Sequence, residues 1–310
     1  MIKHMKKASN TTHIINSISE WVQIASMPKP QHPLICMVNH CDIPQIPADF
    51  WGNIILNFYI ISIKKSFKGK MRYGKNYYDF DEGSMSFISP GQMFSIDDDS
   101  TRDLSGWTLM IHPDFIRNYP LGKQIKEYGF FSYDVHEALH LSDKEENMVE
   151  SIAQNIRQEY NANIDAYSQD VMVSQIELLL NYCNRFYNRQ FITRKIINND
   201  LLAKLNEFLN EYFENKNGFH SGLPTVQYLS EQLNVSPNYL GDMLRLQTGQ
   251  NTQQHIHNKL IEKAKDALST TSLSVSEIAY SLGFEYPQSF NKLFKSKTNV
   301  SPLEFRSSFN

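Results

Sequence analysis

The most constraining feature of this chain is an internal repeat near its C-terminus. Residues 228–245 align with residues 277–295, at an offset of 49 residues in the first half and 50 in the second. The matched positions are Leu229 with Ile278, Leu233 with Leu282, Val235 with Phe284, Leu240 with Phe290, Leu244 with Phe294 and Arg245 with Lys295. Such a repeat indicates two copies of one supersecondary unit.

Each copy predicts a helix, a tight turn and a second helix. In the second copy, Ser274-Val-Ser-Glu277 is a capping box that begins the first helix, and Gly283 can adopt the left-handed conformation that ends it. Asn234 takes that turn position in the first copy, where Ser236-Pro237 is a strong start signal for the second helix. Two helices joined in this way form a helix-turn-helix. Apolar residues at every fourth position predict a further helix over residues 252–268: Ile256, Leu260, Ala264 and Leu268. This helix is expected to link the two helix-turn-helix motifs rigidly.

With these motifs, the C-terminal part of the chain resembles the AraC/XylS family of bacterial transcription regulators. The resemblance is carried by Ser236-Pro-Asn-Tyr-Leu240, Thr248-Gly249, Ala264, Ile278-Ala279, Gly283-Phe284, Ser289-Phe290, Leu293-Phe-Lys295 and Ser301-Pro-Leu-Glu-Phe-Arg306. One departure is Asn299, where the family usually has glycine. The resemblance implies a homodimeric regulator that binds double-stranded DNA, has no enzymatic activity and needs no cofactor. RNA polymerase is a further candidate partner.

The order of the segments also resembles full-length members of that family. It implies an α+β multidomain chain: an N-terminal arm at residues 1–30, a cupin-like β-barrel sensor domain at 31–141, a helical dimerisation segment at 142–195 and an all-α double helix-turn-helix domain at 196–310. In such proteins the barrel senses a signal, so a small-molecule effector or a partner is expected to act on the N-terminal domain.

The second helix of each copy is the predicted recognition helix. Such a helix enters the major groove of DNA, where side chains contact base edges while hydroxyls, amides and cations hold phosphates. Burial of the apolar residues leaves polar side chains facing outward, together with Gly241. The predicted base-reading residues are Asn238, Asp242, Tyr286, Gln288, Asn291 and Lys292. The predicted phosphate ligands are Ser236, Arg245, Ser289 and Lys295.

The charge of the C-terminal region only partly suits a DNA-binding domain. Residues 196–310 hold 10 Lys and Arg against 11 Asp and Glu, a balance of −1, where a basic patch is expected. Residues 286–306 alone are basic, with four cations against one glutamate, a balance of +3. Asp242 would repel phosphate, so the first copy is expected to contribute less affinity or to read a different base type. We therefore expect modest affinity per subunit and dependence on dimerisation.

The N-terminal half predicts strands. Short apolar runs separated by Gly, Asn, Asp and Pro occur over about residues 33–117, and Asn53–Ile63 is the clearest buried strand. Several short strands at this spacing favour a barrel or a sandwich. Several aromatic residues could line a metal-free ligand pocket: Trp51, Phe58, Tyr73, Tyr77 and Phe87. Aromatic residues in a small barrel more often form part of the hydrophobic core.

From residue 142 the apolar spacing changes to three and four residues, which predicts helices. Met148, Ile152 and Ile156 mark the first helix, and a second follows over about residues 168–191. Its apolar stripe indicates packing on a partner subunit or, with equal weight, within one chain. Polar residues at 193–200 are predicted to form a linker.

A second motif suggests an alternative function. His136-Glu-Ala-Leu-His140 matches HExxH, in which two histidines on one helix bind zinc and the glutamate acts as a base. The alternative is a zinc-dependent hydrolase that uses His136, Glu137 and His140. Because the motif is short and no downstream glutamate supplies a third ligand, we predict no metal.

Composition restricts the compartment more than the partner. Three cysteines without a CxxC pair favour a reducing environment, so a cytoplasmic location is expected. The 30 Lys and Arg against 33 Asp and Glu give a net charge of −3, which identifies no partner. Since no run of 18 or more apolar residues occurs, no membrane span is predicted.

Overall fold

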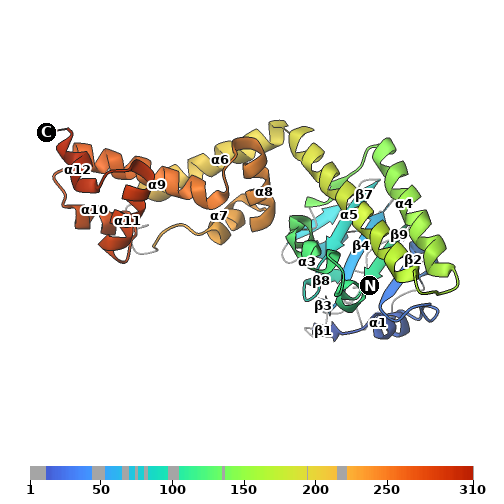
Figure 1. Cartoon of the computed structure of the whole chain (residues 1–310). Helices are drawn as coiled ribbons and strands as arrows, with labels where there is room; N and C mark the ends of the chain where they lie inside the picture. Colours follow the sequence, from blue (N-terminus) through green and yellow to red (C-terminus); the bar gives the residue numbers. More distant parts are fainter. Residues whose placement is uncertain are drawn as a thin grey trace, which may run out of the picture. The chain divides into compact units, whose positions relative to one another are not determined.

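The structure of the chain, a computed structural model, comprises two compact units, residues 1–190 and residues 191–310 (Figure 1). The structure describes residues 12–43, 53–64, 70–73, 76–79, 83–96, 105–134, 137–193, 195–214 and 222–309. Only the backbone is described at residues 70–73, 76–79, 95–96 and 195–197. Among the described helices, none combines the length and the apolar character needed to cross a lipid bilayer.

The first unit is built around two five-stranded β-sheets, with strand orders β1-β3-β8-β5-β6 and β10-β7-β4-β9-β2. The strands are β1 (Thr12–Ile15), β2 (Ile35–Asn39), β3 (Asn53–Leu56), β4 (Tyr59–Lys64), β5 (Lys70–Tyr73), β6 (Asn76–Asp79), β7 (Ser84–Ile88), β8 (Met93–Ile96), β9 (Gly106–Ile111) and β10 (Leu139–His140). Strands β1 and β3 pair in parallel, whereas the other described pairs are antiparallel.

The predicted β-rich N-terminal region is confirmed, but its described strands do not form a closed barrel. Closing a barrel requires hydrogen bonds on both sides of every strand. In the part of the chain that the structure describes, no strand pairing joins the two sheets, and β1, β6, β10 and β2 are their edge strands. The strands therefore form two separate sheets.

Residues 53–63, predicted as one strand, form β3 and β4, which belong to different sheets. Between them, Asn57 donates its backbone N–H to the Ile15 carbonyl at 2.9 Å. The Asn57 side-chain amide also donates to Asn16 Oδ1 at 2.6 Å. These two bonds hold the chain where it passes from one sheet to the other.

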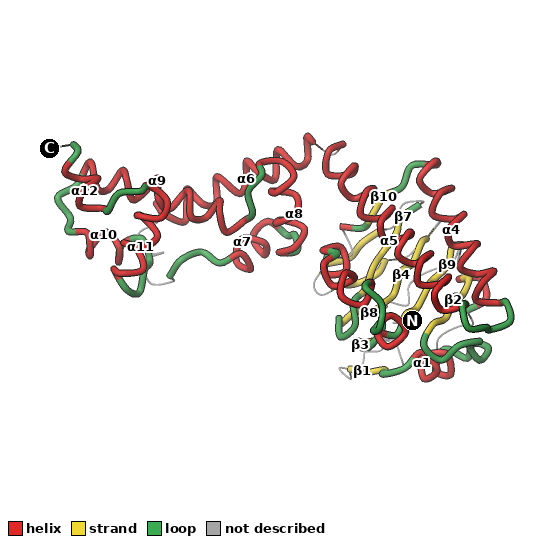
Figure 2. The backbone as a smooth tube through the Cα atoms, viewed as in Figure 1, coloured by secondary structure: helices red, strands yellow, loops and turns green. Residues whose placement is uncertain are grey.

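Helices cover the sheet that contains β4, β7 and β9 (Figure 2). Trp107 Nε1 on β9 donates to Glu150 Oε2 on α4 at 3.1 Å, and Cys183 Sγ on α5 lies 3.9 Å from Met85 Sδ on β7. The inner face of α5 thus packs within its own chain. The helical elements of this unit are α1 (Ile18–Ile24), η1 (His40–Asp42), α2 (Pro113–Ile116), α3 (Leu121–Gln124), η3 (Ile125–Glu127), η4 (Gly129–Ser132), α4 (Asp143–Asn161) and α5 (Ser168–Thr193), which ends in the second unit.

The second unit is helical. Its helices are α6 (Lys195–Glu214), α7 (Val226–Leu233), α8 (Pro237–Thr248), α9 (Thr252–Thr270), α10 (Val275–Ser281), α11 (Pro287–Thr298) and α12 (Pro302–Ser307). The predicted linker at residues 193–200 is wrong, because α6 begins within it. Leu205 and Leu209, one turn apart on α6, are buried, and α6 packs against α7 and α9.

The helix pairs α7–α8 and α10–α11 are the two helix-turn-helix motifs predicted from the repeat. Asn234, with φ of 54°, and Gly283, with φ of 91°, occupy the left-handed turn positions. Helix α9 contacts both α8 and α10. It buries the four residues predicted from their spacing, Ile256, Leu260, Ala264 and Leu268.

Candidate nucleic-acid interface

The second motif buries the apolar side of α11. The Ser274 hydroxyl accepts the Glu277 backbone N–H at 3.2 Å, and the Glu277 carboxylate accepts the Ser274 N–H at 2.7 Å, so the predicted capping box begins α10. Phe290 and Phe294 of α11 are fully buried, and their rings lie 5.7 Å apart. Phe294 also contacts the ring of Phe305 on α12. This packing determines which side of α11 faces solvent.

The polar residues predicted on the second recognition helix lie on its solvent side. Tyr286, directly before α11, is 58% exposed. The other predicted contacts of this motif are also exposed: Gln288, Ser289, Asn291, Lys292 and Lys295. A surface of amides, hydroxyls and ammonium groups can bond base edges and phosphates.

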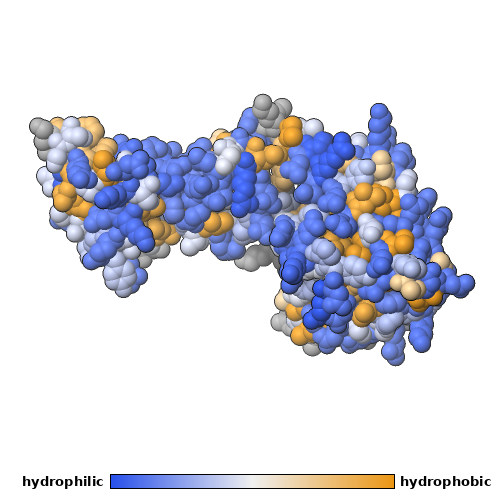
Figure 3. All heavy atoms as spheres, viewed as in Figure 1, coloured by the Kyte–Doolittle hydropathy of each residue, from blue (hydrophilic) through white to orange (hydrophobic). Residues whose placement is uncertain are grey.

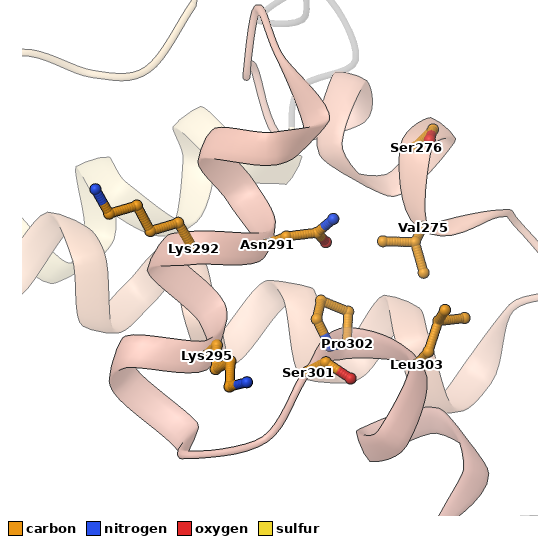
Figure 4. Close-up of a pocket in the computed structure, with 8 residues that line it drawn as sticks. All are labelled: Val275, Ser276, Asn291, Lys292, Lys295, Ser301, Pro302 and Leu303. Carbon is orange, nitrogen blue, oxygen red and sulfur yellow. The ribbon is translucent and has the colours of Figure 1, made fainter.

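A groove of about 450 Å³ runs beside this surface (Figure 4). Asn291 points across it towards Val275 of α10, whereas Lys292 extends along the other side of α11. The groove is lined by Val275, Ser276, Asn291, Lys292, Lys295, Ser301, Pro302 and Leu303. The sequence prediction did not include the start of α12 in this surface. The capping box of Ser301 and Glu304 was the signal that could have placed a helix start there.

The first motif presents fewer polar groups. Asn238 is exposed, and Asp242 and Arg245 form an ion pair with Nη1 and Oδ1 2.9 Å apart. Gly241, predicted to face outward, is buried, and a Cβ added to it would lie 3.9 Å from both Thr252 Oγ1 of α9 and Arg245 Nη1. Ser236, predicted as a phosphate ligand, is only 4% exposed, and its hydroxyl accepts the Tyr239 N–H as the N-cap of α8.

The residues predicted for a ligand pocket fall into two groups. Phe58 and Phe87 are buried, and the Phe87 ring contacts Phe130, Phe131 and Tyr187, so it forms core between the sheet and the helices. Trp51 lies outside the described residues, and for Tyr73 and Tyr77 only the backbone of β5 and β6 is described.

A buried histidine lies in the first unit. His40 is 7% exposed, its Nε2 is 2.8 Å from Thr108 Oγ1, and Thr108 Oγ1 is 2.6 Å from Ser62 Oγ. Burial lowers the pKa of His40 to about 4, the charge of Lys64 acts in the same direction, and a hydrogen bond with the Ser105 backbone opposes both. His40 is therefore neutral at neutral pH.

The predicted zinc alternative does not fit the local structure. His136 lies outside the described residues. Glu137 is 3% exposed and accepts the Asp134 backbone N–H at 2.7 Å, and His140 belongs to strand β10. The HExxH arrangement requires one helix face. No group of three His, Cys, Asp or Glu residues that could hold a metal occurs in the described portions of the chain.

Comparison with known proteins finds similarity in the second unit. The family of the helix-turn-helix domain matches residues 229–308. The uncharacterized transcriptional regulatory protein YesN of Bacillus subtilis is 36% identical over 78 residues, which are 24% of this chain and 21% of that protein. The HTH-type transcriptional activator RhaS of Escherichia coli is 33% identical over 78 residues, which are 25% of this chain and 28% of that protein.

A solved structure is also similar to part of this chain. The C-terminal domain of the two-component response regulator yesN from Fusobacterium nucleatum is 30% identical, with a TM-score of 0.31, over 34% of this chain and 98% of that one. The chain matches only 21% of the length of YesN and 28% of the length of RhaS.

Proposed function

Because the chain belongs, through its C-terminal domain, to the AraC/XylS family of transcription regulators, we propose that it is a sequence-specific regulator that binds operator DNA through both helix-turn-helix units. One observation carries this proposal: the second recognition helix exposes amide and ammonium groups on one side, while its phenylalanine side chains are buried on the other. The zinc-dependent hydrolase has no support from YesN and RhaS, both of which are named as transcription regulators.

In the proposed complex, α11 lies in the major groove. Gln288 and Asn291 bond adenine, Lys292 reaches guanine acceptors, and Tyr286 contacts a neighbouring base edge. Ser289 and Lys295 hold phosphates. In the first motif, Asn238 and Asp242 face bases, and Arg245 holds a phosphate. Ser236, which is only 4% exposed, caps α8 and so positions this helix.

A homodimer supplies the second pair of motifs in this proposal. Apolar side chains gather on the face of the first unit where α4 and α5 lie (Figure 3). On α5, Val171 is 39% exposed and Leu178 is 46% exposed, one heptad apart, and Met148 of α4 is 41% exposed. This spacing suits packing against a helix of a second subunit. Two subunits would bind half-sites about one helical turn of DNA apart.

The N-terminal domain is proposed to receive the signal, a small molecule or a partner, that shifts a balance between conformations with different half-site spacing. A cytoplasmic location and contact with RNA polymerase complete the proposal. Selection of bound fragments from the host genome tests it, because the recovered sites give the operator sequence and the half-site spacing together. Recovery of fragments without a shared sequence would contradict it.

Replacing Asn291 with alanine is expected to weaken operator binding by about 1 to 3 kcal/mol, because a bidentate amide contact to a base is lost. Binding to a scrambled duplex should stay nearly the same, and Lys292→Ala should behave in the same way. Fluorescence anisotropy with both duplexes measures the two affinities. Equal losses on operator and scrambled DNA would contradict base reading at the position tested.

Replacing Lys295 with alanine should weaken binding to every duplex. A contact between a lysine and a phosphate releases condensed counterions. Its loss should therefore make the negative slope of log K against log salt concentration shallower by roughly 1. Titrations between about 50 and 200 mM salt measure this slope. An unchanged slope would remove Lys295 from the phosphate contacts.

A further inference from the structure

The two recognition helices occupy equivalent positions in the repeat but differ in charge. At the offset of 50 residues, Asp242 is equivalent to Lys292 and Arg245 to Lys295, whereas the buried Gly241 is equivalent to the exposed Asn291. Helix α11 carries three lysines and no acidic residue, whereas α8 carries one arginine and one aspartate. The first recognition helix therefore lacks the net positive charge of the second.

The two charged side chains of α8 bind each other. Arg245 Nη1 lies 2.9 Å from Asp242 Oδ1, and the side chains are 60% and 33% exposed, so the ion pair lies on the outer surface. A Cβ built on Gly241 would lie 3.9 Å from Arg245 Nη1. The guanidinium thus folds back along the helix, towards the N-terminal half that faces base edges in a helix-turn-helix.

This position makes Arg245 a conditional phosphate ligand. An exposed ion pair is weak, so a DNA phosphate can compete for the guanidinium. A phosphate that takes Arg245 would, however, lie close to the Asp242 carboxylate, and like charges repel. Contact is favoured where a base offers a donor to the carboxylate, as the amino group of cytosine does.

We propose that Asp242 is a specificity-determining residue of the first motif. Its carboxylate holds Arg245 and so suppresses binding to DNA that lacks a matching base. The inference rests on the proposed DNA-binding function and deepens it. Helix α11 supplies general affinity through its lysines, and α8 contributes affinity mainly at the correct sequence.

The test replaces Asp242 with asparagine in the full chain and measures binding to the selected operator and to a scrambled duplex over a range of salt. Affinity for the scrambled duplex should rise about eightfold at 0.1 M salt, and the salt slope should steepen by about 1, as expected for one new phosphate contact. Operator affinity should rise less, so the ratio between the two affinities falls. The double variant Asp242→Asn/Arg245→Ala should show no gain.

Glu231→Gln is the matched control. It removes the same charge from an exposed position of the same motif, on α7, and leaves the α8 ion pair intact. It should leave both affinities unchanged. The inference is overturned if Asp242→Asn gives no gain, if Glu231→Gln gives an equal gain, or if the gain persists without Arg245. A wild-type chain that binds no duplex would instead contradict the proposed function.

Discussion

Replacing Gly283 with alanine should lower the free energy of unfolding of the second unit by about 3 kcal/mol, with a parallel loss of operator binding. Gly283 has φ of 91°, a conformation that L-residues rarely adopt, and an added Cβ would lie 2.7 Å from the Gly222 carbonyl oxygen. Backbone must move to relieve this contact. Since Gly283 lies between α10 and α11, the shift would displace the second recognition helix. Urea unfolding followed by circular dichroism measures the loss.

Gly249→Ala separates the contact from the dihedral angle. Gly249 ends α8 with φ of 74°, and nothing lies within 4 Å of an added Cβ. The control should therefore cost only about 1 kcal/mol, the penalty for a left-handed alanine. Equal destabilisation by Gly283→Ala and Gly249→Ala would show that the close approach to Gly222 is unimportant.

Acidification should destabilise the first unit through His40, by about 3 kcal/mol. The pKa of His40 is lowered from 6.5 to about 4, so between these values the unfolded chain binds a proton that the folded chain does not. The stabilisation is complete above about pH 6.5 and is lost as the pH falls towards 4. Lys64, whose pKa burial lowers to about 7, is protonated throughout this range and repels a charged His40. Urea unfolding at a series of pH values measures the effect.

His40→Gln provides the comparison, because it removes the titrating group and keeps a polar side chain beside Thr108. The difference in unfolding free energy between wild type and variant should shrink steadily below pH 6.5. A constant difference down to pH 4 would mean that His40 titrates normally in the folded protein.

The second unit is largely predictable because its signals are local. The capping box at Ser274, the N-cap at Ser236 and the left-handed residue at Asn234 each involve neighbours within a few positions, and all three are found. The departure at Asn299 is also explained locally, since it adopts φ of 64° and asparagine tolerates that region.

The features that were missed depend on contacts between distant segments. The break at Asn57 is set by Ile15 and Asn16, some forty residues earlier, while the apolar pattern continues through it. Gly241 is buried with Thr252 of α9 beside it, and a residue without a side chain adds nothing to an apolar pattern. The ion pair of α8 is the exception, since Asp242 and Arg245 lie three residues apart on one helix and that spacing could have indicated the pair.

The helix α9 has a mechanical consequence for operator architecture. Because it packs on both α8 and α10, a single residue inserted into it would rotate one motif against the other by about 100° and move it about 1.5 Å. One base pair rotates DNA by only about 35°. Adding base pairs to the operator one at a time could therefore not compensate such an insertion. The spacing between the DNA contacts of the two motifs within one subunit is effectively fixed.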